Sequence, residues 1–260
     1  MRKFPFFLIV VFGLTSVMLI AWLNKSPPYD VRHLPSEQNV TSAIPDFATI
    51  EDINEKKTAY FAYLAPTVEK HNAYLLQVRS YLSRLKAVSQ VNTSLTSSQL
   101  QQLEFLAHEY KVDIEQPIVS VIDEMLFKID IIPIELVLIQ SANESGWGTS
   151  RFAQQGFNFF GLWCFVENCG FVPIRRNDGA SHEVAKFTNL EDAVYTYMRN
   201  LNRHQAYDEL RQIRYDLRQH QQQIMASQLV EGLTPYSERG LAYIEELQHM
   251  LRTNQELMPL

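Results

Sequence analysis

The first strong apolar pattern in the chain is an uncharged stretch from Phe4 to Leu23, which follows Arg2 and Lys3. A stretch of about 20 apolar residues can cross a bilayer as a helix, and the preceding basic residues favour a cytoplasmic N-terminus. The stretch has no small-x-small cleavage site, so an uncleaved anchor is favoured over a cleaved signal peptide. Residues 1–24 are therefore predicted to be a single-pass membrane anchor that exports the chain after Asn24.

Residues 25–45 contain four prolines and no apolar period, a composition that is typical of a flexible linker. From Phe47 to about Gln90, apolar residues recur at three-, four- and seven-residue spacing, which predicts a helix. Pro66 lies inside this pattern and is expected to kink or divide the helix.

A second helix is predicted to begin near Thr96, which has the spacing to form a capping box with Gln99. Pro117 separates it from a third apolar helix. Residues 46–130 are thus predicted to be the helical N-terminal part of the folded region.

The next helix begins after Pro133 and is apolar enough to lie in the middle of a domain. It is predicted to end within residues 143–148, where two glycines permit a sharp turn. Glu144 would then lie on its last turn.

An antiparallel hairpin is predicted from residues 171–174 and 183–187, which flank the turn signal at residues 177–179. The remaining sequence has helical spacing of apolar residues over residues 190–222 and 227–252. The pattern as a whole indicates a mainly α protein of the α+β class.

Composition and charge restrict the possible partners. The chain is 46% hydrophobic and 20% charged, as expected of a globular protein, and its formal net charge is -6. No Lys/Arg-rich block stands out, so nucleic acid is not an expected partner.

The cysteine count fits an exported protein. Cys164 and Cys169 are the only cysteines, and an oxidising compartment would permit a disulfide between them. A structural zinc site needs four nitrogen or sulfur ligands, and His182 is the only histidine nearby in sequence. A small disulfide loop is therefore predicted, and no metal.

Glu144 is the leading candidate for chemistry. A carboxyl group in an apolar setting tends to keep its proton, which is what the acid of a glycosidase requires. The alternative is a structural glutamate that caps the helix or pairs with an arginine. The helix dipole disfavours an anion at a helix C-terminus, which makes the structural alternative a poor fit.

Two segments strengthen the catalytic interpretation. The run Ala142-Asn143-Glu144-Ser145-Gly146-Trp147-Gly148, followed by Asn158-Phe159-Phe160-Gly161, closely resembles the signature of the bacterial glucosaminidase family of peptidoglycan hydrolases. The similarity runs from about Ile132 to Arg252, and residues 131–254 are predicted to be the catalytic domain.

This resemblance implies a lysozyme-like helical domain with a small β-hairpin lobe, preceded here by the predicted transmembrane helix. It implies cleavage of the β-1,4 glycosidic bond after N-acetylglucosamine, with Glu144 as general acid and no cofactor. The expected partners are peptidoglycan glycan strands, and the expected location is the bacterial inner membrane with the catalytic domain in the periplasm.

The second catalytic group is expected on the hairpin lobe, where Glu183, Asp178 and Glu167 are candidates and Glu183 is favoured because its surroundings resemble the family. Tyr236 matches the first tyrosine of a tyrosine-containing loop of the family, so the resemblance gives it a catalytic role. The residues after it differ from the family's usual string.

Aromatic residues near the motif can stack on sugar rings or fill the core. Trp163 and Phe160 are predicted to contact substrate, together with Asn158, whereas Trp147 is assigned to the core. Asn158 and Gly161 are also expected to shape the loop beneath the acid.

Two other functions remain open. A lytic transglycosylase also uses one glutamate in a lysozyme-like fold, but its anhydro product differs by one water. A non-catalytic, membrane-anchored scaffold that binds the cell wall would use Glu144 for a hydrogen bond only, and fold resemblance alone does not exclude it.

Overall fold

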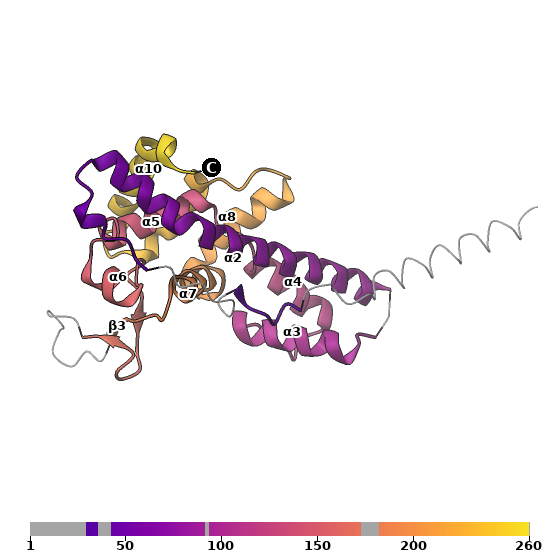
Figure 1. Ribbon diagram of the computed structural model, residues 1–260. Helices are drawn as coiled ribbons and strands as arrows, with labels where there is room; N and C mark the ends of the chain where they lie inside the picture. Colours follow the sequence, from indigo (N-terminus) through magenta and orange to yellow (C-terminus); the bar gives the residue numbers. More distant parts are fainter. Residues whose placement is uncertain (1–29, 36–42, 92–93, 173–181, 260) are drawn as a thin grey trace, which may run out of the picture. The chain divides into compact units, whose positions relative to one another are not determined.

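The computed structural model describes residues 30–35, 43–91, 94–172 and 182–259. These residues form two compact units, which divide within one long helix, α2 (Ile53–Gln90). Of the described residues, those within 30–33 and 76–129 belong to the first unit, and those within 34–75 and 130–259 belong to the second. The mainly helical fold with a small antiparallel sheet is as predicted (Figure 1).

The first unit is built from the second half of α2, α3 (Ser97–Tyr110) and α4 (Ile118–Lys128), and α3 packs against α4. The predicted capping box is present, because Thr96 Oγ1 accepts from the N–H of Gln99 while Gln99 Oε1 accepts from the N–H of Thr96. Pro117 caps the start of α4. These local signals therefore set the helix boundaries in this unit.

Pro66 does not divide α2, contrary to one of the two outcomes expected for it. The side chains around it, Leu64, Ala65 and Val68, are fully or almost fully buried. Packing of these neighbours on a long helix offsets the single hydrogen bond that a proline removes.

The second unit contains a series of helices and short 3-10 segments around α5 (Ile134–Ser145), which packs against α9 (Ala226–Leu229) and α10 (Leu241–Asn254). Its other elements are η2 (Phe47–Thr49), α6 (Arg151–Gly156), α7 (Leu190–Arg203), η3 (Gln205–Tyr207), α8 (Asp208–Gln219), η4 (Val230–Tyr236) and η5 (Gln255–Leu257). Most of α5 is buried, from Leu136 to Ala142, which confirms the predicted central helix.

The turn after α5 depends on two glycines. Gly146 ends the helix in the left-handed conformation, with φ of 56° and ψ of 52°. A Cβ on Gly148 would lie 2.6 Å from the ring of Phe47, so only glycine fits there. The turn places Glu144 on the last turn of α5, as predicted.

The sheet has three short strands, β1 (Trp163–Cys164), β2 (Gly170–Phe171) and β3 (Glu183–Ala185), with β3 in the centre and both neighbours antiparallel to it. The predicted pairing of the two hairpin segments is confirmed at Phe171 and Val184. Strand β1 was not predicted, and the turn at residues 177–179 lies outside the described residues.

The two long C-terminal helical patterns are each interrupted. The first stops at Arg203 and resumes in α8, with η3 between. The second passes through η4, which contains Pro235, and restarts only after Gly240 at φ 53°. Proline and a glycine with positive φ both interrupt an α-helix, although the apolar spacing continues past them.

Within the parts of the chain that the structure describes, no helix is both long and apolar enough to cross a membrane. The anchor predicted at Phe4–Leu23 lies outside those parts.

Candidate active site

Glu144 is half-buried at the end of α5. Its Oε1 accepts a hydrogen bond of 2.9 Å from the hydroxyl of Tyr243 on α10. Its Oε2 lies next to Gly161, where a built Cβ would be only 3.2 Å from that oxygen. The two oxygens therefore have different surroundings, a phenol on one side and the backbone of a glycine on the other.

Burial raises the pKa of Glu144 above its ordinary value, and this effect is larger than the opposing effect of the hydrogen bond from Tyr243. The charge of Glu246 also raises the pKa, while that of Arg239 lowers it. A carboxyl group with a raised pKa keeps its proton at higher pH and is suited to act as a general acid.

Four tyrosines from different elements surround this carboxyl group: Tyr197 on α7, Tyr207 on η3, Tyr236 on η4 and Tyr243 on α10. The rings of Tyr236 and Tyr243 are parallel within 2°, with centroids 5.8 Å apart. Burial raises the pKa of Tyr207 to about 12 and also raises the pKa of the other three. All four therefore stay neutral phenols at physiological pH.

A chain of hydrogen bonds leads from the interior to Glu144. The hydroxyl of Tyr197 donates to Gln140 Oε1, and Gln140 Nε2 donates to the hydroxyl of Tyr243 over 3.0 Å. Tyr243 in turn donates to Glu144. Gln140 is fully buried and lies one helical turn before the acid.

Tyr236, predicted to be catalytic, donates a 2.7 Å hydrogen bond to the backbone oxygen of Phe160. This bond joins η4 to the loop that carries Gly161. The structure thus places Tyr236 beside the acid through its ring contact with Tyr243, with its hydroxyl directed to the backbone.

Asn158 supports the loop rather than facing a ligand. Its amide nitrogen donates to Leu162 and Ala185, and its amide oxygen accepts from the N–H groups of Phe160 and Leu162. The side chain is 2% exposed and forms its hydrogen bonds inside the protein, in agreement with the predicted loop-shaping role.

Phe160 is also buried, and its ring stacks on Tyr197 at 4.1 Å. A sugar ring cannot reach a side chain in that position. The substrate contacts predicted for the side chains of Phe160 and Asn158 therefore do not fit their burial.

Trp163, the third predicted substrate contact, has a different environment. It lies on β1 and is 51% exposed. Its ring makes a T-shaped contact with His182, with the two ring centroids 4.2 Å apart. Trp147, assigned to the core, packs edge-to-face against Tyr60 and Phe61. Trp163 is thus an aromatic residue of the motif region that is open to solvent.

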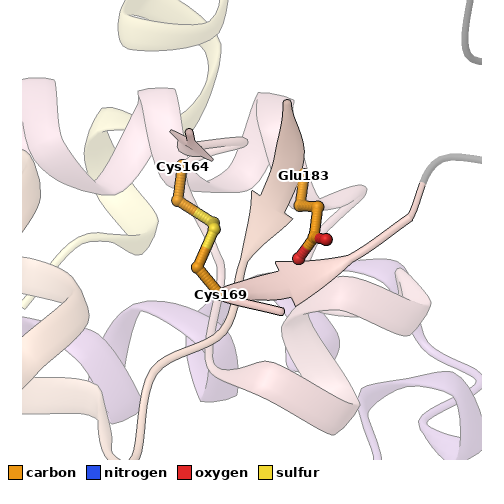
Figure 2. A group of neighbouring side chains, drawn as sticks. All are labelled: Cys164, Cys169 and Glu183. Atoms are coloured by element: carbon orange, nitrogen blue, oxygen red, sulfur yellow. A yellow bond between two sulfur atoms is a disulfide. The ribbon is translucent and has the colours of Figure 1, made fainter. Parts of the chain in front are cut away.

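Cys164 and Cys169 form the predicted disulfide, with their Cα atoms 6.2 Å apart (Figure 2). Glu183 on β3 lies next to it and is 5% exposed. The sulfurs and a carboxylate oxygen of Glu183 are within 4.8 Å of one another, a grouping that resembles a metal site. Because the sulfurs are bonded to each other, they offer no thiolate ligands to a metal.

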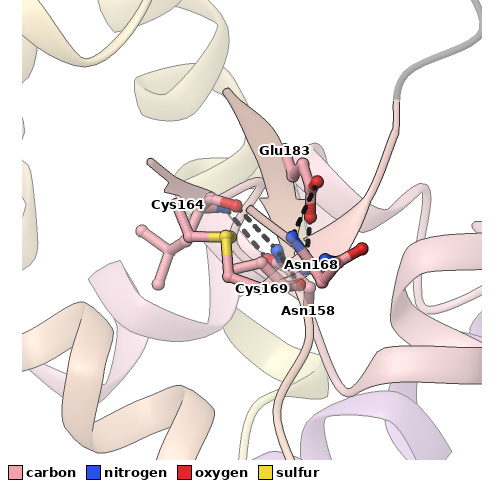
Figure 3. The surroundings of a disulfide bond; sticks show 8 residues. Asn158, Cys164, Asn168, Cys169 and Glu183 are labelled. Carbon is pink, nitrogen blue, oxygen red and sulfur yellow. Dashed lines mark hydrogen bonds between the residues drawn. A yellow bond between two sulfur atoms is a disulfide. The ribbon is translucent and has the colours of Figure 1, made fainter. Parts of the chain in front are cut away.

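Both carboxylate oxygens of Glu183 accept backbone hydrogen bonds from the disulfide loop (Figure 3). Oε1 accepts from the N–H of Asn168 at 3.1 Å, and Oε2 from the N–H of Gly170 at 2.8 Å. Glu183 and the disulfide thus hold the same loop. Of the other candidates for the second acid, Glu167 is exposed on this loop and Asp178 lies outside the described residues.

Sequence reasoning gave no role to Gln140, Tyr197, Tyr207 or Tyr243. Gln140 had a usable signal, because it lies four residues before Glu144 on the same face of a helix. Tyr243 follows Glu144 by 99 residues, and no local pattern links the two.

Two of the cavities formed by the described residues lie in the second unit, and neither lining includes Glu144. One of about 660 Å³ lies beside the disulfide loop and is lined by Phe157, Cys169 and Lys186 among others. A smaller one of about 410 Å³ borders the end of α5 and α10, with Asn143 and Glu246 in its lining. Because neither lining includes Glu144, the candidate site is defined by the contacts of Glu144 and not by a cavity.

The family model described as glucosaminidase, mannosyl-glycoprotein endo-beta-N-acetylglucosaminidase, matches residues 120–256. Protein bax of Escherichia coli (strain K12) is 29% identical over 219 residues, which are 84% of this chain and 77% of that relative. No solved structure matches the chain. The family match covers more than half of the chain and includes Glu144 with the elements around it. The chain therefore belongs to the glucosaminidase family.

Proposed function

We propose that this protein is a peptidoglycan hydrolase that cleaves the β-1,4 bond after N-acetylglucosamine, with Glu144 as the general acid. The observation that carries the proposal is the state of Glu144 itself: a half-buried carboxyl group with a raised pKa, on the last turn of the central helix of a glucosaminidase-family domain.

In the proposed reaction, protonated Glu144 donates its proton to the oxygen of the leaving sugar as the glycosidic bond breaks. Gly161 leaves space beside Oε2, where that oxygen would approach. Tyr243 fixes the position of the carboxyl group through Oε1. The exposed ring of Trp163 is the proposed stacking surface for a sugar.

The identity of the second catalytic group stays a prediction. Glu183 remains the favoured carboxylate from sequence, but both of its oxygens are engaged by backbone N–H groups. Each carboxylate oxygen can accept a further hydrogen bond, so these two bonds orient Glu183 without ruling out a catalytic role. The N-acetyl group of the substrate is the alternative second group. Tyr236 is proposed to act by holding the loop of Phe160 and Gly161 against the acid.

The protein is further proposed to act in the periplasm, held to the inner membrane by residues 1–24. The length and charge pattern of that segment support the anchor. The disulfide supports an oxidising compartment.

The test is Glu144→Gln, which keeps the shape of the side chain but cannot donate an acidic proton. Hydrolysis of purified peptidoglycan should fall by about 10²- to 10⁴-fold, the usual contribution of general acid catalysis, while the protein remains folded. Glu245→Gln is a matched control, because it makes the same change at an exposed glutamate of α10 that does not shift the pKa of Glu144.

Mass analysis of the products separates the enzymatic alternatives. N-acetylglucosamine at the new reducing ends would support the proposal, and anhydro products lighter by one water would identify a lytic transglycosylase. A folded Glu144→Gln protein that cleaves at near the parent rate would remove Glu144 from its role, and an inactive parent protein that binds glycan would indicate a scaffold.

A further inference from the structure

The hydrogen-bond chain that ends at Glu144 has a direction. Tyr197 donates to the oxygen of the Gln140 amide, so the amide nitrogen faces Tyr243 and donates to it. The hydroxyl of Tyr243 already accepts from Gln140, and its own proton goes to Glu144 Oε1. Each donor in the chain thus determines the role of the next group.

An amide can set such a direction because one end only accepts and the other only donates. If the amide of Gln140 turned over, its oxygen would face Tyr243 and take the proton that now goes to Glu144. Tyr243 would then accept a hydrogen bond from protonated Glu144, and the carboxyl proton would lie on Oε1. The hydroxyl of Tyr197 would be left facing a donor, in surroundings where it is fully buried.

We propose that Gln140 and Tyr197 are positioning residues that keep Oε1 of Glu144 as an acceptor and thereby place the transferable proton on Oε2. This inference rests on the proposed function, because it concerns where the proton of the general acid is held. Neither residue contacts the reacting atoms; both act through Tyr243.

The surroundings of the two oxygens explain why this placement matters. Oε1 faces Tyr243 and the buried tyrosines behind it, so a proton there would point into the protein. Oε2 lies beside Gly161, which is half-buried and has no side chain that could cover Oε2. A proton on Oε2 therefore points to the side where a sugar oxygen can approach.

Titratable and charged groups reach Glu144 from each element around it. They are Tyr243 and Glu246 on α10, Arg239 before α10, Tyr236 on η4, Tyr207 on η3 and Tyr197 on α7. The tyrosines are neutral at the pH of the assay, and Arg239 and Glu246 form an ion pair with each other. Changes at Gln140 or Tyr197 leave this ion pair in place, so their effect on Glu144 passes through Tyr243.

A simpler explanation is that the chain only satisfies buried polar groups. The two explanations differ in what they predict for the pH profile. If the positioning role is correct, a change at Tyr197 or Gln140 weakens the hydrogen bond that Tyr243 donates to the Glu144 carboxylate. The protonated form of Glu144 is then favoured, so the alkaline limb of the kcat profile should move to higher pH while the plateau of kcat falls. A purely structural defect would lower the plateau without moving the limb.

The experiment measures kcat and KM on purified peptidoglycan between acidic and alkaline pH for Tyr197→Phe, Gln140→Met, Tyr243→Phe and the double variant Tyr197→Phe/Tyr243→Phe. For Tyr197→Phe, kcat should fall about tenfold, which corresponds to one lost hydrogen bond, with KM unchanged. The alkaline limb should move to higher pH. Gln140→Met should likewise lower kcat and move the alkaline limb to higher pH.

The double variant is the decisive arm. If Tyr197 acts through Tyr243, adding Tyr197→Phe to Tyr243→Phe should change neither kcat nor the limb further. Tyr60→Phe is the matched control. Tyr60 is a fully buried residue of α2, and its hydroxyl is 3.1 Å from Oγ of Ser145, which is on α5 with Gln140 and Glu144. This variant should reduce thermal stability without moving the limb.

Additive losses of kcat in the double variant, or an unmoved limb in Tyr197→Phe and Gln140→Met, would overturn the positioning role. A second readout is the titration of the Glu144 carboxyl carbon by NMR, assigned by its loss in Glu144→Gln, which needs no activity. If Glu144→Gln retains near-parent turnover, the proposed function fails as well; if Glu144→Gln is inactive and the limb does not move, only this inference fails.

Discussion

Gly161→Ala tests directly whether the space beside Oε2 is needed. Gly161 has φ of +62°, a conformation that alanine adopts only with strain, and its Cβ would lie 3.2 Å from Glu144 Oε2. The carboxyl group would have to move by a few tenths of an ångström to restore a normal contact. Such a movement would also disturb the geometry of its 2.9 Å hydrogen bond with Tyr243.

Two separate costs follow from this geometry. The positive φ should destabilise the fold by about 1 to 2 kcal/mol, the usual cost of an L-residue in a left-handed conformation. The methyl group should also block the approach of the sugar oxygen and misplace the acid. Because a misplacement near 1 Å can cost about 10²-fold in rate, we expect kcat to fall roughly 10- to 100-fold.

Gly240→Ala is the matched control, because Gly240 has φ of +53° and no atom within 4 Å of a built Cβ. With ψ of -122°, Gly240 is in a conformation that is at least as strained for alanine, so Gly240→Ala should lose at least as much stability without a comparable loss of turnover. The assay is release of reducing ends from peptidoglycan, divided by the folded fraction from thermal melting. Gly161→Ala with near-parent kcat per folded molecule would refute the idea that the productive proton lies on Oε2.

Four further predictions concern pH, the disulfide loop and the N-terminus. Burial raises the pKa of Glu144, so the folded protein keeps a proton that the unfolded chain has lost, and stability falls as pH rises from the ordinary Glu range through the folded pKa. Glu144→Gln cannot ionise and should be more stable than the parent above that window and equal below it, as measured by urea unfolding at several pH values. Glu183→Gln sets an amide against two backbone donors, so it should lose about 1 to 3 kcal/mol of stability. A loss of turnover per folded molecule would support the catalytic role of Glu183, and retained turnover would leave it a purely structural one. Cys164→Ser should cost about 2 kcal/mol from loop entropy alone, seen as a lower melting temperature that reductant does not lower further. N-terminal sequencing should find Phe4 to Leu23 retained in the membrane fraction, and a mature start beyond Asn24 would contradict the anchor.

Local signals in the sequence predicted what depends on local chemistry. The capping box at Thr96 and Gln99 fixed the start of α3, and Gly146 fixed the end of α5. The position of Glu144 on the last turn followed from that glycine. These features depend on a few neighbouring residues, so one sequence is enough to find them.

Apolar spacing predicted less well where packing or backbone geometry competed with it. Residues 227–252 show helical spacing throughout, but Pro235 and Gly240 break the segment into η4 and α10. That break turns Tyr236 and Tyr243 onto parallel rings, which seven residues of continuous helix would place two turns apart. The break at Pro235 and Gly240, which the apolar spacing does not reveal, therefore brings Tyr236 and Tyr243 together beside Glu144.

Glu183 shows why a second catalytic carboxylate is difficult to assign from sequence. An acidic residue on the small lobe has the residue type and the approximate location that a second catalytic carboxylate needs, and Glu183 is favoured because the sequence around it resembles the family. Its function depends on what its oxygens contact, and those contacts come from Asn168 and Gly170, more than ten residues earlier. Gly170 can supply its N–H because it has no side chain: a Cβ there would lie 1.9 Å from the backbone oxygen of Val184. The same close approach brings β2 against β3 and directs the N–H of Gly170 to Glu183. The hydrogen bond by which Glu183 holds the disulfide loop therefore depends on the pairing of these two strands. By contrast, no backbone N–H among the described residues donates to Oε2 of Glu144, which lies beside Gly161. This difference in the use of the oxygens is why Glu144 is proposed as the general acid.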